Sequence, residues 1–187
     1  MGFHTFDPER ADKLEDASRR YRFCSREELL RALGPAHGGT IADFGSGTGF
    51  YTDEIAPYAE TLHAVDLQAE MHDLYREKGV PETVELVTSD VADLPFATDE
   101  LDGAFSTMTY HEFASPESLA EIARVIRADG VFVVVDWSTD GEGEAGPPRD
   151  ERYGIDDAKE ALTAAGFGID RADDRPETFL VVARVEP

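Results

Sequence analysis

Apolar residues gather along the chain into short runs, and longer segments with a helical period of apolar and charged residues lie between them. The run at 131–137, VFVVVDW, is almost continuous and rich in β-branched residues, which is typical of a strand buried on both faces. The pattern predicts seven strands, at residues 40–44, 61–67, 83–89, 101–109, 131–137, 167–175 and 177–186. It predicts helical segments at residues 7–33, 51–59, 69–79, 116–130 and 155–166.

The helical segments carry their own start and stop signals. Asp7 followed by Pro8 is a good N-cap and first-turn pair, and Ser25 with Glu28 forms a capping-box signal for a second helix inside 7–33. Gly34 and Pro35 end that second helix. In the segment 116–130, the apolar positions share one face of a helix, at residues 119, 122, 123 and 126.

Strand and helix alternate with short connections, so we expect an α/β fold. The expected architecture is a three-layer sandwich, a seven-stranded, mostly parallel sheet with helices on both faces. No helix separates the last two strands, which predicts a C-terminal antiparallel hairpin. At 187 residues the chain fits a single domain, residues 1–187, with a sizeable core. The Gly- and Pro-rich segment 138–153 is expected to be a long loop, either a lid or binding loop or a disordered one.

The strand at 40–44 leads into a loop with three alternating glycines, Gly45, Gly47 and Gly49. One glycine would satisfy a tight turn, whereas three let the backbone approach a ligand beside the free N–H groups of a helix start. A dinucleotide fingerprint needs a third glycine where Phe50 stands, and no lysine is nearby for a phosphate loop. The loop therefore predicts a ligand site that differs from both of these.

Two acids follow the next strands at the same expected edge of the sheet. Asp66 ends the second strand, where a carboxylate can accept hydrogen bonds from both hydroxyls of a ribose; the alternative is a cap of the next helix. Asp90 ends the third strand, where it could accept from an exocyclic amine while the Val91 N–H donates to a ring nitrogen; Asp90 could also be a helix cap. Together with the glycine loop, these residues favour a nucleoside-type ligand.

The charge of the chain narrows the possible partners. Asp and Glu number 40 against 17 Lys and Arg, which gives a net charge of −23, and the acids are spread over the whole sequence. Even spread and few lysines favour a halophile's protein over a mimic of nucleic acid or a binder of basic partners. Nucleic-acid binding is not expected, because it needs basic patches.

Other features of the sequence limit where the protein is expected to work and whether it is expected to bind a metal. The N-terminus lacks a signal-peptide pattern and no apolar run is long enough for a membrane span, so we expect a cytoplasmic protein without membrane contact. Cys24 is the single cysteine, so no internal disulfide is possible and no metal site is expected.

Four blocks of the sequence resemble the class I S-adenosylmethionine-dependent methyltransferases: IADFGSGTGFYTDEIA, HAVDLQAEM, VTSDVADLPFATDELDGAFSTMTYHEF and VIRADGVFVVVDW. The resemblance covers about residues 38–187, and the opening and late segments are similar to a small archaeal and bacterial subgroup of quinone-biosynthesis-like members. It implies a cofactor-binding core at 38–187 and a helical N-terminal segment, residues 1–35, that folds over the cofactor as a lid. The alternative for this segment is a surface helix anchored by its aromatic face.

The resemblance also implies roles for single residues toward S-adenosylmethionine. Asp43 would hold the amino group and Asp66 the ribose hydroxyls, while Leu67 would pack on the adenine face. Thr107 or Met108 would lie under the methionine carboxylate or the sulfonium. The remaining implied contacts are those of the glycine loop with the methionine part and of the third strand end with the adenine edge: Gly45, Ser46, Gly47, Gly49, Asp90 and Val91.

The resemblance predicts methyl transfer to a small-molecule acceptor, with S-adenosylhomocysteine as the other product. His111 is a candidate general base because its ordinary pKa is about 6.5, with Glu112 beside it; His111 could equally hydrogen-bond locally. The main alternatives are an NAD-dependent oxidoreductase, which Phe50 disfavours, and a non-catalytic S-adenosylmethionine-binding module. A protein or RNA acceptor is a further alternative.

Overall fold

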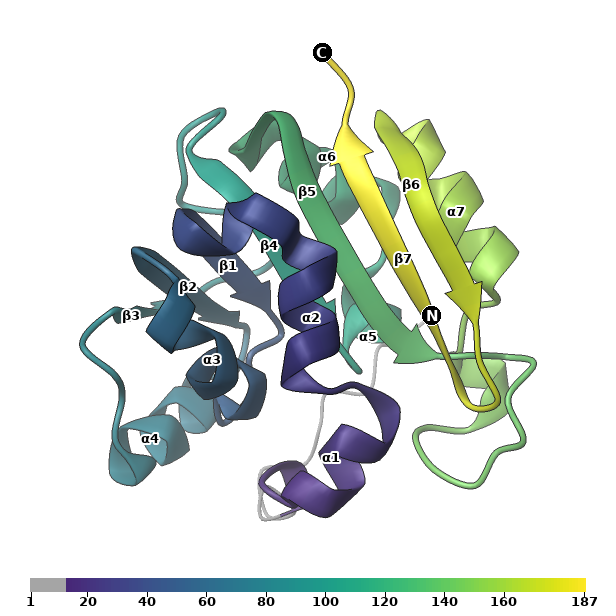
Figure 1. The fold of residues 1–187 in the computed structure, drawn as a ribbon, viewed down its shortest axis with the longest axis horizontal. Helices are drawn as coiled ribbons and strands as arrows, with labels where there is room; N and C mark the ends of the chain where they lie inside the picture. Colours follow the sequence, from purple (N-terminus) through teal and green to yellow (C-terminus); the bar gives the residue numbers. More distant parts are fainter. Residues whose placement is uncertain (1–12) are drawn as a thin grey trace.

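A seven-stranded sheet runs through the molecule between two helical layers (Figure 1). The structure is a computed structural model and describes residues 13–187. The strands are Thr40–Phe44 (β1), Thr61–Asp66 (β2), Val84–Thr88 (β3), Leu101–Thr107 (β4), Ile126–Trp137 (β5), Phe167–Asp174 (β6) and Thr178–Val185 (β7). The α-helices of the described part are Ala17–Phe23 (α1), Arg26–Leu33 (α2), Phe50–Ile55 (α3), Ala69–Lys78 (α4), Tyr110–Phe113 (α5), Pro116–Val125 (α6) and Ile155–Ala164 (α7).

The strand order is β3-β2-β1-β4-β5-β7-β6. The first five strands are parallel to one another, and β7 lies between β5 and β6, antiparallel to both. This is the predicted mostly parallel sheet with a C-terminal antiparallel hairpin, so the expected fold class is confirmed.

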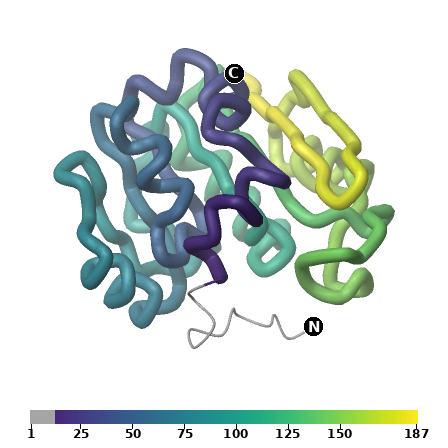
Figure 2. The backbone as a smooth tube through the Cα atoms, turned by 60° about the horizontal axis from the view of Figure 1, so that its bottom comes forward, coloured from purple at the N-terminus to yellow at the C-terminus, as the bar shows by residue number. Residues whose placement is uncertain are grey.

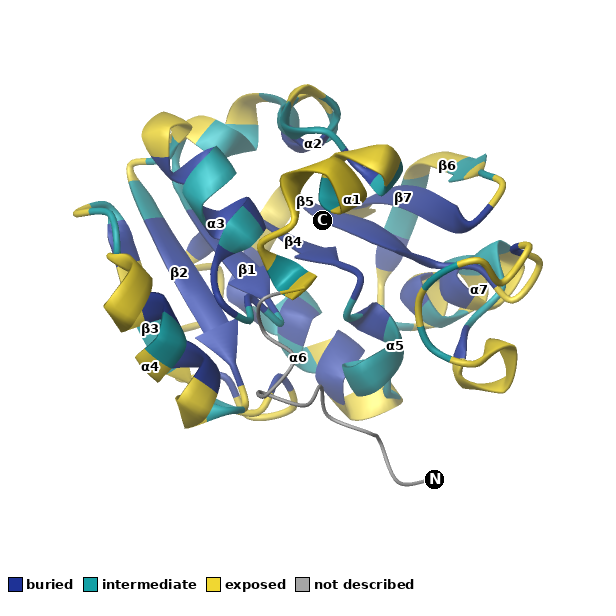
Figure 3. Ribbon diagram, turned by 90° about the horizontal axis from the view of Figure 1, so that it is seen from below, coloured by how far each residue is buried: buried dark blue, intermediate teal, exposed yellow. Residues whose placement is uncertain are grey.

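Side chains of the central strands alternate between two apolar cores, as expected for strands buried on both faces. In β5, Phe132 and Val134 point into the core beneath α6 and α7. Val133 and Val135 point into the core beneath α2 and α3. The burial view shows the same arrangement, with the central strands buried and most exposed residues on the outer helices and loops (Figure 3).

The parallel strands β1 to β5 all end at one edge of the sheet, and the N-terminal helix α1 lies over that edge (Figures 1 and 2). The Tyr51 hydroxyl on α3 fixes it there by donating hydrogen bonds to the carbonyl oxygens of Arg20 and Cys24, each at 2.9 Å. Since binding sites in such sheets lie beyond the carboxyl ends of the strands, α1 is placed to cover one.

The predicted helical segment 7–33 contains two helices in its described part, and its expected start at Asp7 lies outside the described residues. Asp16 caps α1, since its carboxylate accepts a hydrogen bond from the Arg19 N–H. Ser25 caps α2 by accepting from the Glu28 N–H at 3.2 Å, as the capping-box signal predicted.

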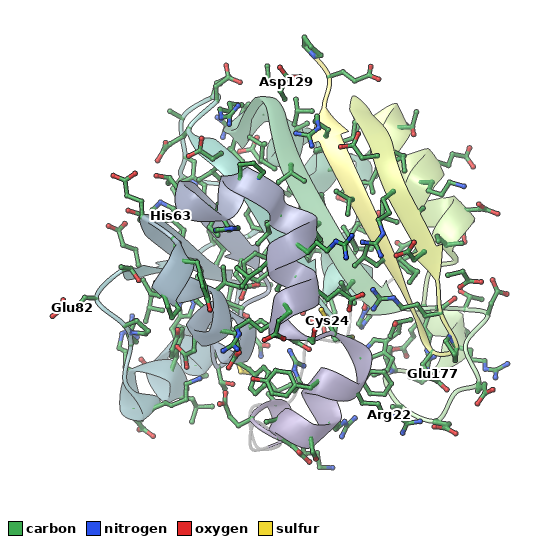
Figure 4. All side chains as sticks on the ribbon, viewed as in Figure 1. Arg22, Cys24, His63, Glu82, Asp129 and Glu177 are labelled. Atoms are coloured by element: carbon green, nitrogen blue, oxygen red, sulfur yellow. The ribbon has the colours of Figure 1, made fainter. Side chains whose placement is uncertain are left out.

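The predicted helix 116–130 is five residues too long. The helix α6 ends at Val125, and Ile126 pairs with Leu101 of β4 as the first residue of β5. Two β-branched residues in succession weaken a helix end, while pairing with β4 satisfies their backbone groups. The strand then passes through Asp129, whose φ of 61° marks a tight bend at the end of the molecule far from α1 (Figure 4).

The long loop after β5 is held in place by a buried ion pair. The Arg152 guanidinium lies 3.5 Å from the Glu177 carboxylate, and it also donates hydrogen bonds to the carbonyl oxygens of Pro147 and Ala145. The Glu177 carboxylate, in turn, accepts from the backbone N–H groups of residues 143 and 144. Arg22 of α1, labelled near Glu177 in Figure 4, pairs with Glu144, so the loop and the N-terminal helix contact each other.

Candidate active site

The glycine loop follows β1 and reaches the start of α3. Gly45, Gly47 and Gly49 have φ values of 76°, 54° and 82°, a region that favours glycine. The N–H groups of Gly45 and Ser46 donate to the Val65 carbonyl oxygen on β2, at 2.9 and 3.0 Å. A side chain on Gly45 would lie 2.3 Å from Thr109, so this glycine allows the loop to pack against the end of β4.

Gly49 has a packing role that can be tested. Its φ is 82°, and a Cβ atom there would lie 2.2 Å from the Tyr75 ring. We expect Gly49→Ala to lower the free energy of unfolding by about 3 kcal/mol, the sum of a left-handed backbone and an overpacked neighbour. Gly166→Ala is the control, since φ there is 95° with no atom within 4 Å, and it should cost only about 1 kcal/mol. Equal losses in chemical denaturation would show that the Tyr75 contact carries no cost.

A cavity of about 270 Å³ opens beside the glycine loop, at the carboxyl ends of β1, β2 and β4. Seven of the predicted binding residues line it: Gly45, Ser46, Gly47, Asp66, Leu67, Asp90 and Val91. Met108, predicted as the alternative to Thr107, lines it as well, next to Thr109. The other three predicted residues do not line it: Asp43 is buried behind the loop, Gly49 is the N-cap residue of α3 against Tyr75, and Thr107 is buried at the end of β4.

Asp66 holds two backbone segments of this cavity. One carboxylate oxygen accepts from the Gly47 N–H at 2.8 Å, and the other accepts from the Gln68 N–H at 2.9 Å. The residue is largely buried, and burial raises the pKa of its carboxyl. The Gln68 bond closes a turn before α4 and is not a helix cap, because the N-cap residue of α4 is Gln68 itself and no side-chain hydrogen bond caps the helix. The place of Asp66 in the cavity wall agrees with the ligand role.

The far wall of the cavity combines one exposed apolar side chain with polar backbone. Leu67 is 57% exposed, which is unusual for a leucine next to a buried strand end. The Asp90 side chain is exposed and accepts a hydrogen bond from the Ala92 N–H at 2.9 Å, and Val91 is buried beside it. A flat, polar-edged ring would cover the leucine and meet these groups.

Asp43 is a buried acid beneath the glycine loop. One of its oxygens accepts from the Thr52 hydroxyl at 2.7 Å, and the other has no hydrogen-bond partner among the residues that the structure describes. Burial raises the pKa of Asp43 to about 7, against the opposing effects of Thr52 and of the Arg20 guanidinium. A positively charged ligand group nearby would restore the ionised form.

A second cavity, of about 220 Å³, lies next to the first, between α1, α5 and the loop after β5. The two cavities share four wall residues: Leu14, Arg20, Met108 and Glu112. Met108 has a φ of 62°, a strained conformation for a residue with a side chain, and it turns the chain from β4 into α5. The short helix α5, Tyr110–Phe113, was not predicted from the sequence.

His111 lies on the second cavity and is held by a buried acid. Its Nδ1 atom is 3.0 Å from both carboxylate oxygens of Asp136, which is fully buried at the end of β5, and its backbone N–H donates to the same carboxylate at 2.6 Å. Burial lowers the pKa of His111, but the charge and hydrogen bond of Asp136 outweigh it, so the pKa is raised. This arrangement leaves Nε2 as the atom that can exchange a proton.

Glu112 is next to His111 and borders both cavities. Its carboxylate lies 3.9 Å from the His111 Nε2 atom. Burial raises the pKa of Glu112 to about 7, and the nearby His111 opposes this shift. The helix α5 therefore carries two neighbouring titratable groups whose pKa values are both raised.

Sequence reasoning missed three residues of this region: Arg20, Thr109 and Asp136. The signal for Asp136 was present, since it is a lone acid after five apolar residues at the end of a buried strand. The signal for Arg20 was absent, because its place over both cavities depends on how α1 folds back across the sheet.

The described residues include no group of three or more His, Cys, Asp or Glu side chains placed to hold a metal ion. Between residues 13 and 187, no helix is long and apolar enough to cross a membrane.

Comparison with known proteins identifies the family. Residues 42–134 match the family model of a methyltransferase domain. The structure of a SAM-dependent methyltransferase from Aquifex aeolicus superposes with a TM-score of 0.86 at 29% identity, covering 97% of this chain and all of that one. The chain belongs to the S-adenosylmethionine-dependent methyltransferases. The family and the cofactor predicted from the four sequence blocks are thereby confirmed.

Relatives with curated names agree with this assignment. An uncharacterized methyltransferase of Mycobacterium tuberculosis is 30% identical over 160 residues, which are 84% of this chain and 60% of that protein. A demethylmenaquinone methyltransferase of Corynebacterium kroppenstedtii is 30% identical over 115 residues, 61% of this chain and 48% of that protein. This methyltransferase thus spans about half of the length of the curated relatives it matches.

Proposed function

We propose that this methyltransferase moves the methyl group of S-adenosylmethionine to a small-molecule acceptor bound in the second cavity. The observation that carries the proposal is the shared wall of Met108 and Glu112. One side of this wall has the features of a nucleoside site, and the other side has a histidine held for proton transfer. The wall is where a donor methyl group and an acceptor atom could meet in line.

For the donor, we assign the ribose hydroxyls to Asp66 and the adenine to Leu67, Asp90 and Val91. The exposed Leu67 side chain and the Asp66 carboxylate line one cavity, which supports this assignment. Gly45, Ser46 and Gly47 would face the methionine part with their backbone.

Three predicted residues are assigned to the donor less directly. Asp43 supplies negative charge beneath the loop, where the donor's ammonium group would stabilise its ionised form. The Asp43 oxygen that has no hydrogen-bond partner within residues 13–187 supports this assignment. Gly49 and Thr107 lie behind the cavity wall, and we assign them the support of the loop and of Met108.

For the acceptor, we propose that neutral His111 removes the proton of the attacking group. S-adenosylmethionine supplies an electrophilic methyl group on a sulfonium, so the protein has to align the acceptor and take up one proton. Asp136 is then a positioning residue, because it fixes the His111 ring and stabilises the imidazolium. The N-terminal helix and the loop 138–153 form the outer walls of the acceptor cavity, the first as a lid and the second as a fixed loop.

Calorimetric titration with S-adenosylmethionine and with NAD tests the donor, and transfer of a labelled methyl group to a cell extract tests catalysis. We expect saturable binding of S-adenosylmethionine alone and a labelled small molecule. Binding of NAD instead would favour an oxidoreductase, and tight S-adenosylmethionine binding without transfer would favour a non-catalytic module. Label in protein or RNA would replace the small-molecule acceptor.

We further propose that the protein works in the cytoplasm of a halophile, without nucleic-acid partners, because the acids that give the net charge of −23 are spread along the whole sequence. Repulsion between the acids is screened over about 10 Å at 0.1 M salt and about 3 Å at 1 M. The melting temperature should therefore rise by about 5–10 °C between 0.1 and 2 M KCl, which corresponds to about 2–4 kcal/mol. Sucrose at matched osmolality controls for exclusion effects. A melting temperature that falls or stays constant with KCl would contradict the proposal.

A further inference from the structure

We propose that the methyl acceptor is a small phenol that carries a carboxylate, and that its hydroxyl oxygen is methylated. This inference rests on the proposed function and names the chemical class that the second cavity would take.

Positive charge on the second cavity is the first observation. Of the 17 lysines and arginines, Arg10 lies outside the described residues and eleven others form ion pairs with acids. The five that form none with the acids of the described part are Lys13, Arg19, Arg20, Arg31 and Arg149. Three of these five, Lys13, Arg19 and Arg20, line the second cavity. In a chain with net charge −23, this grouping makes the cavity a local site for an anion.

The apolar walls indicate a flat ligand. Phe23 and Trp137 meet edge to face, with ring centroids 4.8 Å apart and an interplanar angle of 69°. Leu14, Met108 and Pro147 add to the apolar lining. Aromatic walls of this kind bury planar rings well, which favours an acceptor with an aromatic ring.

The polar side chains of the second cavity indicate which atom of the acceptor is methylated. Arg19 and Arg20 would hold the carboxylate by charge-assisted hydrogen bonds. Glu112 is the acid that faces the same cavity, and because its pKa is about 7 its protonated form can donate to that anion rather than repel it. His111 faces the cavity from α5, where a phenolic hydroxyl can give it a proton.

The step balances without any further reactant. The phenolic O–H proton moves to the His111 Nε2 atom, the oxygen bonds to the donor methyl carbon, and the carbon–sulfur bond breaks with its electron pair on sulfur. The products are an aryl methyl ether, S-adenosylhomocysteine and an imidazolium that returns its proton to water.

The test uses the full chain saturated with S-adenosylhomocysteine, whose own binding is measured first. The three hydroxybenzoate isomers and the matching hydroxybenzamides are then titrated by calorimetry at constant ionic strength. At least one acid should bind about tenfold more tightly than its neutral amide, as one charge-assisted hydrogen bond predicts. Arg19→Gln should reduce this preference while Arg20 remains, and Arg19 is the one to replace because it lines the second cavity and not the first. Arg31→Gln removes an equally unpaired charge away from the cavity and should leave the preference unchanged.

Labelled S-adenosylmethionine then identifies the product, which should be the methyl ether. Equal affinity for acids and amides, no binding of either while S-adenosylhomocysteine still binds, or a methyl ester as product would each overturn the inference and leave the proposed function standing. Failure of S-adenosylhomocysteine to bind would overturn the proposed function and this inference with it.

Discussion

Replacing Asp66 by alanine is expected to weaken S-adenosylmethionine binding about a hundredfold. The assigned role of Asp66 gives it two hydrogen bonds between a charged acceptor and the ribose hydroxyls, each worth about 1.5–3 kcal/mol, and about 2.7 kcal/mol corresponds to a hundredfold change. The carboxylate is largely buried at the end of β2, so solvent cannot replace it. Calorimetric titration of the wild type and the variant gives the ratio of dissociation constants.

A structural effect of the same substitution has to be separated from the loss of ligand contacts. Asp66 also accepts hydrogen bonds from the N–H groups of Gly47 and Gln68, so its removal can loosen the glycine loop. Asp66→Asn keeps one acceptor oxygen and should lose less affinity than Asp66→Ala at equal melting temperature. Asp73→Ala removes the same charge from the exposed side of α4 and should leave affinity unchanged. Wild-type affinity in Asp66→Ala would remove Asp66 from the ribose site.

The strands and their direction could be predicted because the information is local. The central strands are short apolar runs, such as residues 131–135 in β5, and a helix between two runs indicates a parallel crossover. The end of α6 could not be predicted from periodicity, because Val125 and Ile126 suit a helix face and a strand equally well. Ile126 is in a strand because it pairs with Leu101, which lies 25 residues earlier in the chain.

The candidate site likewise has one part that the sequence predicts and one part that depends on tertiary packing. The residues of the donor cavity stand at the ends of β1, β2 and β3, so the topology of a parallel sheet brings them together wherever the helices lie. The acceptor cavity is built from α1, α5 and the loop after β5, segments that contact one another through tertiary packing. Asp136 illustrates the difference: its position after an apolar run was visible, but its contact with His111 depends on how α5 turns back at Met108.

Replacing His111 by alanine should lower the rate of methyl transfer by a factor of about 10²–10⁴, the usual contribution of a general base. Binding of S-adenosylmethionine should stay within about twofold, because His111 does not line the donor cavity. Transfer of a labelled methyl group under single-turnover conditions measures the chemical step directly. His37→Ala removes a histidine that precedes β1, at the opposite edge of the sheet, and should leave both quantities unchanged.

The pH dependence of this rate distinguishes a base from a residue that only supports the fold. The neutral imidazole accepts the proton, so the rate should rise with pH through the pKa of His111, which burial lowers but Asp136, Glu112 and Glu151 together raise above its ordinary value. Asp136→Asn removes the largest of the raising charges while keeping a hydrogen-bond acceptor for Nδ1. The acidic limb of the rate profile should then move to lower pH even though the maximal rate falls, because the imidazolium has lost its stabilising charge. If the acidic limb of the rate profile stays at the same pH in Asp136→Asn, the titrating group is not His111. Glu112 would then be the candidate, because it borders both cavities.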